Sequence, residues 1–249
     1  MSKYRYRENK IYCGDFLDVD IYPVFKKAGA RKERYKPTSE MQARLNASRA
    51  KKKLERLLHT NFTSNDYALH LTYDNNCLPE GAEQAQKDVQ NYLRRLRRFY
   101  KNNGLELKYV SVTEKGKKSG RIHHHIIING GADRTQIEEL WHKGYANSRK
   151  LRFTKNGLAG LSSYIVKQPL LFKRWTCSRN LKKPLERKND YKYSTGKVRA
   201  IYEFKYTERD IEKLYPGYFV SEADPMYNAV NGGYYIQIRL YKKTARILN

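Results

Sequence analysis

Residues 67–153 carry the clearest hydrophobic pattern of the chain. Apolar and polar side chains alternate in four segments, which predicts strands with one buried face at 67–73, 107–114, 120–128 and 145–153. Apolar residues recur at helical spacing between 89 and 100 and again between 137 and 141. The resulting order of strand, helix, strand, strand, helix, strand is that of ferredoxin-like and RRM-like folds. We therefore expect an α+β domain whose antiparallel sheet carries both helices on one face and leaves the other face available for a site.

The segment before this core is predicted to contain a basic helix. A Pro-Thr-Ser sequence at 37–39 followed by Gln42 has the pattern of a capping box, and about twenty helical residues should follow it. Residues 18–25 are a candidate strand. We treat residues 1–66 as a basic N-terminal extension with a helix.

The segment after the core carries weaker signals. Residues 158–168 have the spacing of a short helix that Pro169 ends. Thr207 begins a second short helix, and alternation over 234–240 predicts a last strand. We therefore place the core at 67–170 and a basic C-terminal extension, packed on the core, at 171–249.

The charge of the chain indicates the class of its partner. Lysine and arginine number 51 against 25 acidic residues, giving a formal net charge of +26. Such an excess is typical of proteins that bind a polyanion, and nucleic acid is the first expectation. A membrane surface is the second, although no stretch approaches the roughly 18 apolar residues of a spanning helix. Residues 1–10 lack the apolar stretch of a secretory signal, and the three cysteines are scattered, so we expect a cytoplasmic protein.

Clusters of basic residues are the expected contacts to phosphate. They lie in the predicted N-terminal helix, around the helical stripe of 89–100, next to the histidine-rich strand, and after Pro169. The expected contacts are Arg49, Lys51, Lys52, Lys53, Arg94, Arg95, Arg97, Arg98, Arg121, Lys173 and Arg174. A row of charges that only faces solvent is the alternative.

Half of the six histidines occur side by side in the strand 120–128. Because successive side chains of a strand point to opposite faces, His123 and His125 share one face and His124 lies on the other. Two imidazoles at alternate positions form a two-point anchor for a divalent metal. Glu114 ends the preceding strand, and a hairpin over 115–120 would bring its carboxylate beside His123 as a third ligand. Polar residues on a half-exposed strand are the alternative.

Tyr164 and Lys167 lie three residues apart in the predicted helix 158–168. At this spacing their side chains are neighbours, so the ammonium group could approach a phosphate held by the phenol oxygen. A role in the core or on the surface is the alternative for a tyrosine in a chain with 22 of them.

Three motifs in this order resemble those of the HUH single-strand endonucleases, and in particular the rolling-circle replication initiators. Leu-His-Leu-Thr-Tyr at 69–73 is similar to the first strand of that family, and His123-His124-His125 is similar to its His-hydrophobic-His motif. Tyr-Ile-Val-Lys at 164–167 is similar to its Tyr-x-x-Lys motif. The resemblance spans about 67–168, and it departs from the family in having His124 where a bulky apolar residue is usual.

The resemblance implies an enzyme that nicks and rejoins single-stranded DNA. Tyr164 would be the nucleophile, assisted by Lys167, and would give a 5′-phosphotyrosine link and a free 3′-hydroxyl. His123, His125 and Glu114 would hold Mg²⁺ or Mn²⁺. The partners would be single-stranded or hairpin DNA at a replication origin and the host polymerase and helicase, in a prokaryotic cytoplasm, with the gene on a plasmid, phage or other mobile element.

Three other functions remain open from the sequence. The same order of elements occurs in RNA-recognition modules, which bind without catalysis, although the aromatic signature of those domains is missing near Arg121. A hydrolase that activates water would use the metal but not Tyr164. Conjugative relaxases and transposases share the core of the same superfamily.

Overall fold

The computed structural model describes residues 4–25, 39–116, 119–158, 174–229 and 231–247. The chain forms two compact units. We call the first, residues 47–153 and 158–182, the core unit; the second, residues 1–46, 154–157 and 183–249, is the terminal unit. No helix in the part of the chain that the structure describes is long and apolar enough to cross a membrane.

The core unit contains the predicted βαββαβ series. Its elements in chain order are β3 (Tyr67–Thr72), α2 (Ala82–Asn102), β4 (Tyr109–Lys115), β5 (Ile122–Ile128), α3 (Arg134–Glu139) and β6 (Ala146–Lys150), with the short strand β7 (Thr176–Cys177) added later. The sheet has the order β6-β3-β5-β4-β7, and every pairing in it is antiparallel. Because β5 lies between β3 and β4, this is the split βαβ arrangement, and the α+β prediction is confirmed.

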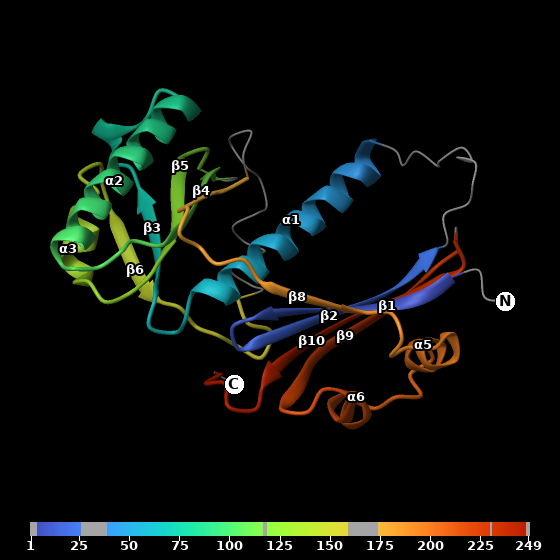
Figure 1. Cartoon of the computed structure of the whole chain (residues 1–249). Coiled ribbons are helices and arrows are strands. Elements are labelled where there is room, and N and C mark those ends of the chain that lie inside the picture. Colours follow the sequence, from blue (N-terminus) through green and yellow to red (C-terminus); the bar gives the residue numbers. More distant parts are fainter. Residues whose placement is uncertain (1–3, 26–38, 117–118, 159–173, 230, 248–249) are drawn as a thin grey trace. The chain divides into compact units, whose positions relative to one another are not determined.

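Both helices of the core unit cover one face of this sheet (Figure 1). The apolar stripe of α2, which includes Tyr92 and Leu96, packs with Leu71 of β3 and Ile126 of β5 in one buried cluster. Trp141, which follows α3, is fully buried in the same cluster, and its indole N–H donates to the carbonyl of Thr72 at 2.7 Å. The helical spacing read from the sequence therefore marks the side of α2 that faces the sheet.

The opposite face of the sheet has an apolar end and a polar end. At the apolar end Val110, Val112 and Ile127 are almost completely buried. At the polar end lie Glu114 and His123, which are paired across β4 and β5. Ile127 shares the histidine face, as strand alternation requires, because it belongs to the buried end of that face. This surface, called the histidine face below, therefore offers its polar groups over only part of its length.

The terminal unit is built around a second antiparallel sheet of order β8-β1-β2-β10-β9. Its strands are β1 (Tyr4–Cys13), β2 (Phe16–Phe25), β8 (Leu185–Asn189), β9 (Tyr218–Asn228) and β10 (Gly233–Lys242). The helices α5 (Thr195–Tyr202) and α6 (Glu208–Leu214) contribute Val198 and Ile211 to its core. The predicted strands at 18–25 and 234–240 are present, and Thr207 forms a capping box with Asp210. The domain boundaries placed at 66 and 170 stay predictions.

The predicted basic helix is present as α1 (Ser39–Asn61). Thr38, its expected capping position, lies outside the described residues. Near the end of α1, Leu54 and Leu58 are fully buried, whereas Arg49 and Lys53 are exposed. A one-turn 3-10 helix, η1 (Asn75–Cys77), follows β3. The helix α1 therefore combines an apolar side with a basic one, as its sequence indicates.

Candidate metal centre

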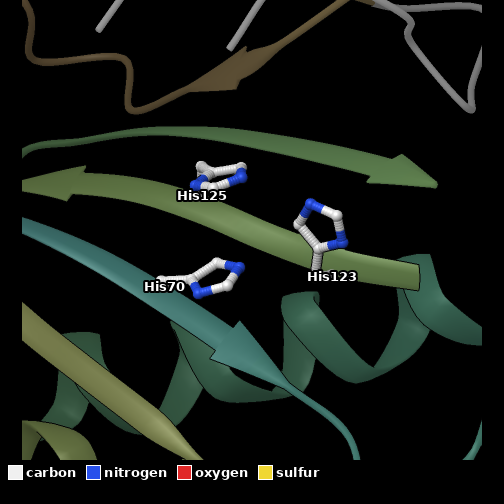
Figure 2. Close-up of side chains that lie close together, drawn as sticks. All are labelled: His70, His123 and His125. Atoms are coloured by element: carbon white, nitrogen blue, oxygen red, sulfur yellow. The ribbon is translucent and has the colours of Figure 1, made fainter. Parts of the chain in front are cut away.

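Three histidines converge on the histidine face of the core unit (Figure 2). The register of the sheet causes this: His70 on β3 pairs with His125 on β5, and His123 lies two residues before His125 on the same face. The ligand nitrogens of the three rings all lie within 4.8 Å of one another. Strand alternation therefore selects His123 and His125, as predicted, and strand pairing adds His70.

Glu114 is the carboxylate of this site. It pairs with His123 across β4 and β5, as the predicted hairpin requires, and it is 9% exposed. Its Oε1 accepts hydrogen bonds from Nε2 of His123 at 2.7 Å and from Nε2 of His125 at 2.9 Å. One carboxylate oxygen thus links the two histidines that were predicted from the sequence, which is the position expected of a third ligand.

His70 is the member of the group that sequence reasoning missed. Its ring stacks on that of His125, with centroids 4.7 Å apart and an interplanar angle of 13°. Its Nε2 is buried and has no hydrogen-bond partner among the described residues. A buried imidazole nitrogen without a partner is costly unless a ligand satisfies it. The available signal was its place between Leu69 and Leu71, because both of these face the helices and His70 therefore cannot.

His124 lies on the helix face and serves the core. It is fully buried, and its two ring nitrogens form hydrogen bonds with the hydroxyls of Tyr73 at 2.9 Å and Thr113 at 2.8 Å. Its ring also makes an edge contact with Trp141. Burial lowers the pKa of His124 to about 3, so the ring is neutral at physiological pH. Both nitrogens are used, and this residue is not a candidate ligand.

The electrostatics of the site favour neutral imidazoles. Burial lowers the pKa of His125 to about 4, and burial together with the nearby His123 lowers the pKa of His70. A neutral imidazole has a lone pair to give to a metal, whereas an imidazolium has none. Three imidazoles, one carboxylate and one unsatisfied buried nitrogen form a donor set that suits a divalent transition metal.

The arginines of α2 lie across the sheet from the histidines, because α2 covers the opposite face. Arg94, Arg97 and Arg98 are exposed. Arg95 is engaged in the fold: its guanidinium donates to the carbonyls of Leu140 at 2.9 Å and Trp141 at 3.3 Å. Its predicted contact with phosphate would compete with these two bonds, whereas the three exposed arginines remain candidates for it.

The other predicted basic contacts are dispersed. In α1, Lys51 and Lys52 are half-buried next to the exposed Arg49 and Lys53. Arg121 is exposed two residues before His123 and donates to Asn75. Arg174, half-buried, precedes β7. Three predicted site residues lie outside the described residues: Tyr164, Lys167 and Lys173.

A comparison with known families places this site in a functional class. Residues 66–169 match the family model of the replication-associated protein ORF2. The replication-associated region, as we call these residues, contains His70, Glu114, His123 and His125 and also the positions of Tyr164 and Lys167. The match agrees with the expected resemblance to rolling-circle replication initiators. No curated protein and no solved structure matches the chain.

Proposed function

We propose that the chain is a replication initiator that nicks and rejoins single-stranded DNA with a metal bound at the histidine face. The observation that carries the proposal is the convergence of His70, His123, His125 and Glu114 at one point, within a region that matches a replication-associated family. The unsatisfied Nε2 of His70 supports a bound cation, because nothing in the described protein compensates its burial.

The three histidines would hold the cation, and Glu114 would complete its shell or orient His123 and His125. When bound, a divalent cation would supply charge stabilisation to a phosphodiester. We propose Mn²⁺ or another transition metal in preference to Mg²⁺, because Mg²⁺ favours oxygen ligands and this donor set is mostly nitrogen.

Tyr164 would act as the nucleophile. Its phenolic oxygen would attack phosphorus, the bond from phosphorus to O3′ would break, and O3′ would leave as a hydroxyl after taking a proton. The 5′-phosphate would then be esterified to the phenol, so the energy of the cleaved bond is retained and the step can be reversed. A phenol has an ordinary pKa near 10, and the ammonium of Lys167 would favour its deprotonated form.

A gel assay for a covalent protein–DNA adduct tests this proposal. Single-stranded and hairpin oligonucleotides from the replicon that encodes the protein are incubated with the full chain and manganese, then boiled in detergent. A tyrosine nucleophile leaves a linkage that survives, whereas a water-activating hydrolase cuts without one and a binding module does neither. Tyr164→Phe is expected to abolish the adduct. Cleavage without an adduct would replace this proposal with the hydrolase.

A further inference from the structure

A basic groove of about 520 Å³ lies at the β6 edge of the core sheet. Its described lining contains four cationic side chains, from Arg134, Arg149, Lys150 and Arg152, and no acidic one. Ala68, Leu151 and Leu158 form the apolar part of the lining. None of these residues was among the expected phosphate contacts, because the sequence disperses them between α3, β6 and the segment that follows.

The cations of this groove are little used by the fold. Arg149, Lys150 and Arg152 are exposed, and no ion pair joins any of the three to a described acidic group. Arg134 makes only a long contact with Glu138, at 4.0 Å. Because like charges repel when they are held close together, a lining of this kind is favourable when an anion binds between them.

One row of side chains connects this groove to the candidate metal centre. On β6, Asn147 pairs with His70 and Arg149 pairs with Ala68, so both belong to the histidine face. Arg149 Nε donates to Asn147 Oδ1 at 3.2 Å, and Asn147 Nδ2 donates to the phenol oxygen of Tyr145 at 3.3 Å. Tyr145 is 63% exposed. An exposed ring, an amide and a guanidinium thus follow one another along the sheet edge, with the amide beside His70.

We infer that this edge binds single-stranded DNA, with the backbone phosphates in the basic groove and a base stacked on Tyr145. The inference rests on the proposed function, whose substrate it positions: a strand that follows β6 passes His70, and so brings a phosphate to the histidines. A cationic groove combined with an exposed aromatic ring is the usual design of single-strand binding, in which phosphates give affinity and ring faces accept any base. The arginines of α2 lie on the other side of the sheet and cannot belong to this path.

Salt-dependent binding of a labelled single-stranded oligonucleotide to the full chain, with chelator present to prevent cleavage, tests the inference. Arg149→Gln combined with Arg152→Gln removes two groove charges. We expect the log-log slope of affinity against salt to become shallower by about 1.4, and the affinity near 0.15 M salt to fall about tenfold. The matched control, Lys188→Gln with Arg209→Gln, removes two exposed charges of the terminal unit that have no described ion pair, and should leave both quantities near their parental values.

Tyr145→Ala tests the stacking part of the inference. We expect its affinity to fall at least about fivefold with an unchanged salt slope, because a ring is lost and no charge is. Tyr191→Ala is its control, since Tyr191 is 89% exposed in the terminal unit. Groove and control variants that weaken binding equally would overturn the inference, as would a loss that occurs with RNA of the same sequence but not with DNA.

The result is separable from that of the proposed function. Manganese affinity, measured on the same variants, should equal that of the parent, because the groove residues hold no ligand. Groove variants that bind DNA like the parent, in a protein that still forms the covalent adduct, overturn the DNA path and leave the nicking function intact. Groove-dependent DNA binding in a protein that forms no adduct supports the path and removes the nicking function.

Discussion

Replacement of His70 by phenylalanine separates a metal ligand from a packing residue. Phenylalanine keeps a ring that can stack on His125, but it has no nitrogen. In the metal-free protein the change should be neutral or stabilising, because the buried Nε2 has no described partner and its desolvation costs about 1–3 kcal/mol. A residue needed only for folding would show the opposite sign.

The metal-loaded protein should respond in the other direction. At a manganese concentration of about 100 times the dissociation constant, binding stabilises the parent by about 2.7 kcal/mol. If loss of a ligand weakens binding about 100-fold, the same concentration stabilises the variant by only about 0.4 kcal/mol. For a chain of this size the parental gain corresponds to a rise in melting temperature of roughly 5 to 10 °C.

Thermal unfolding with manganese and with chelator, together with a titration of free manganese by electron paramagnetic resonance, measures both effects. His123→Ala is the positive control for loss of the site. A His70→Phe protein that binds manganese as tightly as the parent would refute the assignment of His70. A variant that is strongly destabilised without metal would show that His70 has a structural role instead.

Three further predictions follow from the same contacts. His124→Leu should lower the free energy of unfolding by about 2–4 kcal/mol in denaturant titrations, because the hydroxyls of Tyr73 and Thr113 lose their partner, yet manganese affinity should not change. Arg95→Met should cost about 1–3 kcal/mol of stability without altering the salt slope of DNA binding, whereas Arg97→Gln should leave stability unchanged and make the slope shallower by about 0.7 if α2 contacts phosphate. Calorimetric affinities should rise from Mg²⁺ through Mn²⁺ to Co²⁺, and tighter binding of Mg²⁺ than of Mn²⁺ would exclude a nitrogen-rich site.

Much of the core unit could be predicted because its signals are local. The period of two in β5 separates His123 and His125 from His124 without any knowledge of the neighbours. The hairpin to β4 then places Glu114, since the two strands are connected by a short loop. The stripe of α2 marks its buried side in the same way.

The remaining features depend on contacts between distant residues. His70 joins the site through the pairing of β3 with β5, 55 residues along the chain, and a lone histidine in a strand does not reveal its partner. Arg95 has the sequence of a surface arginine, and only the position of α3 turns its guanidinium toward two carbonyls. β1 was missed because its charged residues hide the alternation, and it pairs with β8 from the other end of the chain.

The most direct test of the central claim is the fate of the two ends of a cleaved oligonucleotide. The account predicts that manganese-dependent cleavage leaves the label of the 3′ end covalently on the protein and releases the label of the 5′ end with a free 3′-hydroxyl that a polymerase can extend. Mass spectrometry of the adduct should place the DNA on the peptide that contains Tyr164. Retention of the 5′-end label, or cleavage in which neither fragment stays on the protein, would contradict the account.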